Sequence, residues 1–503
     1  MNNKLTHVAI IFVCLCLLSA SNSWNTINHG HSYSYKQATD YKRALHGHQE
    51  ALAGLVERAY EKRDEYWLNQ AAQLGNSSAF YKLATITTDE NVRREWLQKA
   101  ASAGEAAAQF EWSLLQTKQS RQHKYLLQSA EQDYLPAQHA LANWFLLNQN
   151  ETAAIPWLEK TATHYADDAF ALANILWRNE QQQEAIDWYQ IASENGHTRA
   201  LNYHSIASGK KPISLLNLDQ HSIEFEYNLA TRDSNCAKQI LPLSLSLANQ
   251  VQAEDFVKRL TTDERLQTLP ICISKPVWID TNSGFCDIRS IAGRNRASCD
   301  LTKLSQLIAL NNVTHVVIFL PDGRAYVNAG VMYLDILASY SVFVHELAHF
   351  SGFADEYPIS NQLAEYQCAA QTAPNLLFDG ELTYSPQPRL AKWQEYAVYQ
   401  ASQPLTLYAA RTCNNIGKKA YKMTAERTFM EFHDTDNIPL SYRVLWRDQL
   451  INKNHWYPVA INLARFYEAN NQVSESRQWR LLAEQQRALG MPLERPQGIA
   501  ITE

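Results

Sequence analysis

Long apolar runs and an excess of charge of one sign are both missing from this sequence. Its 503 residues carry 45 Lys and Arg against 51 Asp and Glu, a formal net charge of −6. No basic stripe of the kind that binds nucleic-acid phosphates is present, nor a polybasic run for an anionic membrane. The apolar run from Val8 to Leu18 is shorter than the roughly 20 residues of a membrane span. We therefore expect neither a nucleic-acid partner nor a stable membrane span.

The N-terminal segment 1–23 follows the three-part pattern of a cleaved secretory signal. Lys4 precedes the apolar run, and the small polar residues "SASNS" follow it. An uncleaved anchor is the alternative interpretation of the same pattern. We expect this segment to be a signal peptide and the mature protein to be secreted or periplasmic. His29 and His31 would then belong to a disordered new N-terminus rather than to a metal site.

Cysteine is absent from residues 24–235, and no Cys-x-x-Cys pair occurs, which argues against a cysteine-ligated zinc site. Without Cys14 and Cys16 of the signal, six cysteines remain, at positions 236, 272, 286, 299, 368 and 413. An even number suits disulfide bonds in an oxidising compartment. Their pairing stays open, but we predict the bridge Cys368–Cys413, which would brace the loop after the histidine motif described below.

A regular repeat of aromatic and small residues fills the first half of the chain. Segments that begin with an aromatic residue return at nearly equal intervals; they are "WLNQAAQLG" from Trp67, "WLQKAASAG" from Trp96, "YLLQSAEQD" from Tyr125, "WLEKTATHY" from Trp157 and "WYQIASENG" from Trp188. Each is followed by a second helical pattern of small and apolar residues. One helical pair cannot bury its own apolar face, so this period predicts stacked pairs. Gly75, Gly104 and Gly196 stand where a helix would end in a left-handed residue.

These segments resemble the Sel-one-like branch of the tetratricopeptide-type repeats. The resemblance implies an α-solenoid over residues 24–212 that presents a surface to other proteins, with the Trp and Tyr stripe in its core. A further unit returns at 446–503, in "YPVAINLARFYEAN" and "WRLLAEQQRALG". The repeats would therefore flank the middle of the chain on both sides.

The periodicity changes to short strand-like runs within residues 213–445. "KPVWIDT" (275–281), "THVVIFL" (314–320) and "AYVNAGVMYL" (325–334) are rich in Val, Ile and aromatic residues, and "PDG" (321–323) is turn chemistry. We expect a mixed α/β domain in which 325–334 is an edge strand before a buried helix. Such an edge can hold an extended peptide.

The helix after that strand carries the chemistry of the chain, in "SVFVHELAHFSGFADEY" (341–357). His345 and His349 are four residues apart, so they project from one helix face and can share a metal ion. Glu346 is placed to take a proton from water that zinc has activated, since zinc lowers the pKa of water to about 7. A catalytic zinc site needs a third protein ligand and an open position.

Three carboxylates are candidates for the third ligand. Gly352 would end the helix and let the chain turn back, which brings Asp355 to the metal, and we predict that ligand. Glu356 is adjacent, and Glu365 lies sixteen residues past His349 in "NQLAEYQ". Glu365 would imply a gluzincin arrangement, and both alternatives stay open.

The string H-E-x-x-H-x-x-G-x-x-D resembles the metzincin motif with an aspartate ligand, as in snapalysin-like proteases. "GFADEY" is also similar to the IgA-peptidase-like zinc proteases, which have one more residue before the glycine. The metzincin resemblance implies a methionine turn beneath the metal, for which Met430 in "RTFMEF" is the first choice and Met423 the second. Some metzincins have a catalytic tyrosine two places after that methionine, but Phe432 stands there. Tyr357 could supply the hydroxyl instead.

Together these patterns predict an α+β protein, an α-solenoid flanking a zincin-like metallopeptidase domain. The first hypothesis is a secreted or periplasmic zinc metallopeptidase, a metalloendopeptidase that hydrolyses protein or peptide substrates, whose repeats recruit a protein. The alternative is a non-catalytic adaptor whose metal site is structural or inactive. Glu346 favours catalysis, because a structural site has no use for that carboxylate.

Overall fold

The computed structural model describes residues 32–215, 225–227, 236–280, 284–291, 294–370, 372–383, 388–399, 405–452 and 457–487. The predicted signal peptide, with His29 and His31 after it, lies outside these residues. Within them, every helix is too short or too polar to cross a membrane. The chain divides into two compact units, Met1–His204 and Ser205–Glu503.

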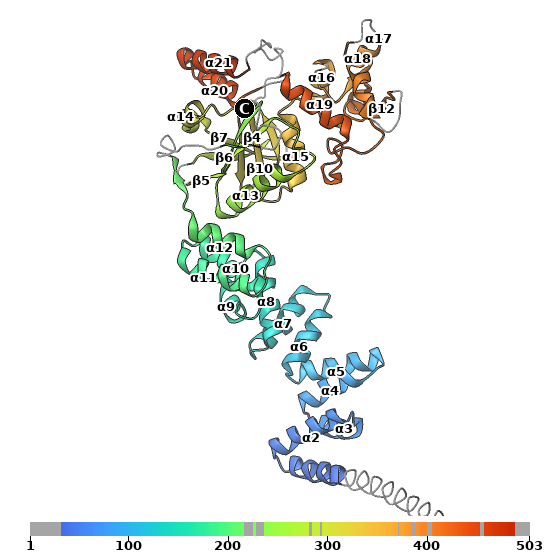
Figure 1. Ribbon diagram of the computed structural model, residues 1–503. Coiled ribbons are helices and arrows are strands. Elements are labelled where there is room, and N and C mark those ends of the chain that lie inside the picture. Colours follow the sequence, from blue (N-terminus) through green and yellow to red (C-terminus); the bar gives the residue numbers. More distant parts are fainter. Residues whose placement is uncertain are drawn as a thin grey trace, which may run out of the picture. The chain divides into compact units, whose positions relative to one another are not determined.

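The first unit is built from helices that follow one another in antiparallel pairs (Figure 1). A helix over 32–45 comes first. The others are α2 (Gln49–Glu61), α3 (Glu65–Gln73), α4 (Ser77–Ile86), α5 (Glu90–Ser102), α6 (Ala106–Leu114), α7 (Gln119–Ala130), α8 (Leu135–Leu147), α9 (Glu151–Thr161), α10 (Ala166–Arg178), α11 (Gln182–Glu194) and α12 (Ala200–Gly209), whose last residues belong to the second unit. The predicted helical repeats are confirmed, since the five aromatic segments form α3, α5, α7, α9 and α11.

Turn chemistry sets the ends of these helices. Gly75, Gly104 and Gly196 have φ of +78°, +94° and +91°, as predicted for residues that end a helix in the left-handed region. At the other end, the Asp64 side chain accepts a hydrogen bond from the Trp67 N–H and so caps α3. Local sequence therefore fixes the repeat length.

The aromatic stripe is only partly core, which corrects the expectation from sequence. Leu68 and Leu97, each one residue after the aromatic position, are 0% and 1% exposed. The aromatic residues themselves are half-buried and pack against these cores, and Trp96 contacts the clusters of two successive repeats. Trp96 therefore connects two neighbouring repeats.

An eight-stranded mixed sheet organises the second unit. Its main path runs β1-β5-β3-β8-β10-β9, with β4 on β3 and β2 on β4. The strands are β1 (Ile213–Ser214), β2 (Phe225–Tyr227), β3 (Lys238–Ser244), β4 (Ile271–Ser274), β5 (Val277–Asp280), β8 (His315–Leu320), β9 (Tyr326–Asn328) and β10 (Val331–Asp335). The strands β4, β5 and β8 run parallel to β3, and β10 runs parallel to β8. The sheet ends in the antiparallel strand β9.

The prediction of a single edge strand over 325–334 is wrong, because this segment forms two antiparallel strands, β9 and β10, joined as a hairpin. Val331 pairs with Asn328, so the loop is the dipeptide Ala329–Gly330. Both loop residues have positive φ, 44° and 83°, which is the two-residue turn whose twist suits antiparallel strands. The edge of the sheet is therefore β9, and β10 lies inside.

Alternate residues of the central strands enter two separate cores, as strand geometry requires. Val317 and Phe319 pack with α13 (Leu247–Thr262), α15 (Tyr340–His349) and α19 (Leu440–Ile451) on one face. Val316 and Ile318 pack on the other face with α14 (Ser305–Leu310) and α20 (Val459–Ala469). The sheet is thus covered on both faces, and α15 is held against it by a large apolar core.

Smaller elements complete this unit. They are β6 (Cys286–Ile291), β7 (Arg294–Cys299), η3 (Leu301–Leu304), α16 (Asn361–Ala370), β11 (Leu377–Phe378), α17 (Asp379–Thr383), α18 (Pro388–Tyr396), η4 (Ala397–Tyr399), β12 (Tyr408–Ala410), η5 (Asn414–Ile416), β13 (Ala420–Lys422), η6 (His433–Thr435) and α21 (Val473–Arg487). Three disulfides join Cys236–Cys272, Cys286–Cys299 and Cys368–Cys413. The predicted bridge is the third, and it joins α16 to the loop before η5.

The C-terminal helices pack onto the sheet rather than forming a separate compact unit. The predicted boundary at 445/446 falls inside α19, and that at 212/213 follows α12. Val459 N–H at the start of α20 donates to Thr314 O at 2.7 Å, and Val459 lies in the second core. Gln486 in α21 donates to Val313 O at 3.2 Å. The α20–α21 hairpin therefore shares the core of the second unit.

Candidate metal centre

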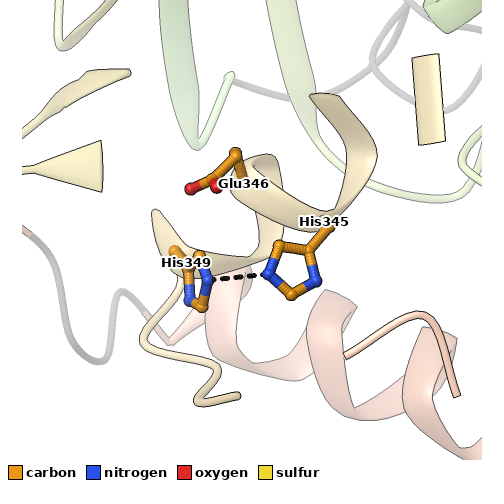
Figure 2. Close-up of side chains that lie close together, drawn as sticks. All are labelled: His345, Glu346 and His349. Carbon is orange, nitrogen blue, oxygen red and sulfur yellow. Dashed lines mark hydrogen bonds between the residues drawn. The ribbon is translucent and has the colours of Figure 1, made fainter. Parts of the chain in front are cut away.

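Helix α15 presents the two histidines of the motif on one face. Its N-terminus is capped by the Ser339 side chain, which accepts from the Val342 N–H at 3.3 Å. Figure 2 shows the imidazoles of His345 and His349 facing each other, with Glu346 on the same turn. Their Nε2 atoms are 3.2 Å apart. The spacing of the two histidines thus produces the convergence that the sequence predicted.

Asp355 reaches the two histidines because α15 stops at His349. Gly352 has φ of +82°, in the region that favours glycine, and the chain reverses there. Asp355 Oδ1 lies 3.1 Å from His345 Nε2 and 3.3 Å from His349 Nε2. This oxygen is buried and has no hydrogen-bond partner in the part of the chain that the structure describes. A cation between the three atoms would satisfy it.

The three distances fit a tetrahedral zinc site. Bonds of about 2.0–2.1 Å from zinc to imidazole nitrogen or carboxylate oxygen place adjacent ligand atoms roughly 3.3 Å apart. The observed separations are 3.1–3.3 Å. Two imidazoles and one carboxylate are also a donor set of catalytic zinc sites, which keep one position open. The residues present therefore fit zinc.

Main-chain carbonyls orient both imidazole rings. His345 Nδ1 lies 2.8 Å from Phe429 O, and His349 Nδ1 lies 2.8 Å from Phe353 O. A carbonyl can only accept, so each Nδ1 carries the proton and donates. Each Nε2 then directs its lone pair toward the other ligand atoms, as a metal ligand requires.

The carboxylate of Glu346 is 7% exposed and lies close to the ligand atoms. One ligand-capable atom from each of His345, Glu346 and His349 lies within 4.8 Å of the others. Burial raises the pKa of Glu346, and the two nearby histidines oppose that rise. A carboxylate with a raised pKa is a stronger base, which suits a proton acceptor beside a metal centre.

Asp355 also acts on the pKa of His349. Burial alone would lower the pKa of His349, but the neighbouring Asp355 carboxylate raises it to about 9. Burial would likewise raise the pKa of Asp355, yet His349 and His345 hold it well below its usual range. The surroundings of Asp355 therefore favour its ionised form, which is the form that a metal ligand needs.

The alternative third ligands point elsewhere. Glu356 is fully buried, with its carboxylate bonded to Asn375, Thr428 and Tyr442. Glu365 lies on an exposed face of α16. Of the three candidates, the structure brings Asp355 to the histidines.

The predicted methionine turn lies next to the site. Met430 is 0% exposed and belongs to the turn Thr428–Glu431, in which Glu431 N–H donates to Thr428 O at 3.0 Å. It directly follows Phe429, whose carbonyl accepts from His345. Met423 is also buried, in the same apolar core.

Aromatic side chains flank His345. The Tyr357 ring is stacked near it, with centroids 6.4 Å apart, and burial raises the pKa of the Tyr357 hydroxyl. Phe432, at the place of the metzincin tyrosine, is 50% exposed. Sequence reasoning missed His433, whose ring centroid is 6.3 Å from that of His345 and whose charge acts on Glu346. The only feature of the sequence that pointed to His433 was its position shortly after Met430, the predicted methionine of the turn.

Comparisons with known proteins leave the second unit unassigned. No family model matches the chain, and no curated protein matches it. Among solved structures, a protective antigen of uropathogenic Escherichia coli with an SLR fold is similar at 21% identity over 33% of this chain and 42% of that one, with a TM-score of 0.27. This chain thus spans less than half of that protein.

Two further structures show the same weak likeness. A Sel1 repeat protein from Oxalobacter formigenes has 19% identity over 32% of this chain and 80% of that one, with a TM-score of 0.25. The pilF protein of Pseudomonas aeruginosa has 15% identity over 34% and 82%, with a TM-score of 0.24. These scores are too low to assign a fold, so the description of the repeats rests on their own helices.

Proposed function

We propose that this protein is a zinc-dependent peptidase, working in the periplasm or outside the cell, with a helical repeat unit that binds protein. The observation that carries the proposal is the convergence of His345 Nε2, His349 Nε2 and Asp355 Oδ1 within 3.1–3.3 Å. Glu346 beside them gives the site the base that hydrolysis needs. Three disulfides support an oxidising compartment.

His345, His349 and Asp355 would hold the ion, which supplies Lewis acidity for the attack of water on a carbonyl. Glu346 accepts a proton from that water at its carboxylate and delivers it to the leaving amine. The strand β9 ends the sheet, so its outer main-chain groups can pair with an extended substrate. Tyr357, whose ring is stacked near that of His345, would donate its hydroxyl to the substrate.

The second candidate function is a non-catalytic adaptor. The repeat unit by itself supports it, because stacked helical pairs form extended surfaces for protein partners. A structural zinc site would require a fourth protein ligand. His433 is one candidate for it, because its ring centroid lies 6.3 Å from that of His345; its Nδ1 already lies 2.7 Å from Asp434 Oδ1. Its Nε2 would then be the ligand atom.

One pair of variants separates the two functions. Zinc content and cleavage of a labelled, unfolded protein such as casein would be measured for the full-length chain, its Glu346→Gln variant and a Glu365→Gln control. A peptidase predicts zinc in all three, with cleavage lowered about 10²–10⁴-fold or more in Glu346→Gln alone. Equal cleavage in Glu346→Gln would refute the assigned base. Zinc without cleavage in the unmodified chain would favour the adaptor.

A further inference from the structure

Glu356 is a fully buried carboxylate that directly follows Asp355. Burying a charge is destabilising unless neighbouring groups compensate it. Its oxygens accept three hydrogen bonds and lie near a buried ammonium; the partners are Tyr442 Oη (2.6 Å), Asn375 Nδ2 (3.0 Å), Thr428 Oγ1 (2.6 Å) and Lys422 Nζ (3.6 Å). Compensation on this scale means that the position of Glu356 is strongly determined.

These partners belong to the segments that build the metal centre. Thr428 begins the turn that contains Phe429 and Met430, and the Phe429 carbonyl orients His345. The Glu356 N–H donates to Met430 O at 2.9 Å. Main chain and side chain of Glu356 therefore both hold this turn against the Asp355 segment.

The residue on the other side of Asp355 is fixed by the same network. The Asn375 side chain accepts from Ala354 N–H at 2.8 Å and donates to Ala354 O at 2.9 Å. Asp355 O itself accepts from Thr412 Oγ1 at 2.6 Å. The main chain is thus held before, at and after Asp355, while Asp355 Oδ1 has no hydrogen bond of its own among the described residues.

We propose that Glu356 is a positioning residue for the metal centre: its buried carboxylate locks the Asp355 segment to the Phe429–Met430 turn. One anchor would then set two distances, that from Asp355 Oδ1 to the histidines and that from Phe429 O to His345. The inference rests on the proposed function. Metal affinity depends on ligands being held in place before the ion arrives, and partners outside the ligand set contribute about 10–100-fold.

The test compares variants that disturb the anchor with one that disturbs a different buried carboxylate. Glu356→Gln keeps the shape but places an amide N–H₂ against hydrogen-bond donors. Tyr442→Phe removes one donor and nothing else. Asp168→Asn is the control, because Asp168 is a buried carboxylate of the first unit, held by His139 Nδ1 at 2.8 Å and by the Thr161 hydroxyl.

Zinc affinity would be measured by competition with a chromogenic chelator, at a temperature where each variant is folded. The visible absorption of the Co²⁺-loaded protein would report ligand geometry. We expect zinc affinity to fall about 10–100-fold in Glu356→Gln, and in the same direction by less in Tyr442→Phe. The cobalt spectrum should change in both. Asp168→Asn should lower only the melting temperature.

The inference is overturned if Glu356→Gln and Tyr442→Phe lose thermal stability but bind zinc as tightly as the unmodified chain. In that case their Co²⁺-loaded forms would also have the same visible spectrum as the Co²⁺-loaded unmodified chain. That result would leave the proposed function standing. An unmodified chain that binds no zinc would instead overturn the proposed function, and the inference with it. If Glu356→Gln does not fold, the milder Tyr442→Phe decides between these outcomes.

Discussion

Gly330, in the turn between β9 and β10, offers a quantitative test of how the C-terminal helices are attached. A Cβ atom at this position would lie 2.4 Å from Val459 N, 2.6 Å from Pro458 C and 2.7 Å from Tyr457 O. All three are main-chain atoms, so no side-chain rotation can relieve the overlap. The turn of the edge strand therefore touches the N-terminus of α20 directly.

Gly330→Ala should weaken this attachment for two separate reasons. Its φ of +83° costs an L-residue about 1–2 kcal/mol. The overlap with main-chain atoms costs about 1–3 kcal/mol more, the usual range for overpacking. The sum is about 2–5 kcal/mol. Gly417→Ala is the matched control, because Gly417 has φ of +68° and nothing within 4 Å of the added Cβ. Gly417→Ala should therefore show only the free-energy cost of the positive φ, without the cost of the overlap.

The assay is amide hydrogen exchange of the peptide that contains Val459, whose N–H donates to Thr314 O. A decrease of about 2–5 kcal/mol in the free energy of local opening raises the exchange rate roughly 30- to 4,000-fold, at about 1.4 kcal/mol per factor of ten. In Gly417→Ala this peptide should exchange as in the unmodified chain. Equal protection in the two variants would show that the hairpin does not rest on the β9–β10 turn, and would refute the reasoning.

Three further outcomes follow from the structure. Asp355→Ala should weaken zinc binding at least about 10-fold, by chelator competition, while Glu365→Ala should not; the reverse result would mean a gluzincin-like site. A fragment covering 24–212 should be strongly helical by circular dichroism and unaffected by reductant, since all three disulfides lie in the second unit; a β-rich spectrum would contradict the repeats. Asp263 is partly buried, which opposes ionisation, but Arg265 holds its pKa below the usual value. Its contribution, about 2 kcal/mol for charge-assisted hydrogen bonds, is present above about pH 4 and lost as the pH falls through the folded pKa. Urea unfolding of Asp263→Asn should therefore differ from the unmodified chain at neutral pH and converge with it in acid.

The repeats and the histidine helix could be predicted because their information is local. The regular return of the aromatic segments, with glycine where a left-handed residue must end a helix, determines a helical pair whatever the rest of the chain does. His345 and His349 meet because a helix brings residues at this spacing onto one face. The helix stop at Gly352 is equally local, and it carried the prediction for Asp355.

Only the tertiary structure decided which distant groups complete the site. Phe429 O, which orients His345, lies 84 residues away in sequence, and Tyr442, which holds Glu356, lies 86 residues away. Such partners depend on how α15, α19 and the turn at Thr428–Glu431 pack into one apolar core, which no local pattern encodes. The hairpin at 326–335 was missed for a related reason. Its two-residue turn differs from a continuous strand only in the sign of φ at Ala329 and Gly330, which the residue pattern does not reveal. The local sequence was enough to predict the candidate ligands His345, His349 and Asp355, and the packing of remote segments determines how their side chains are held.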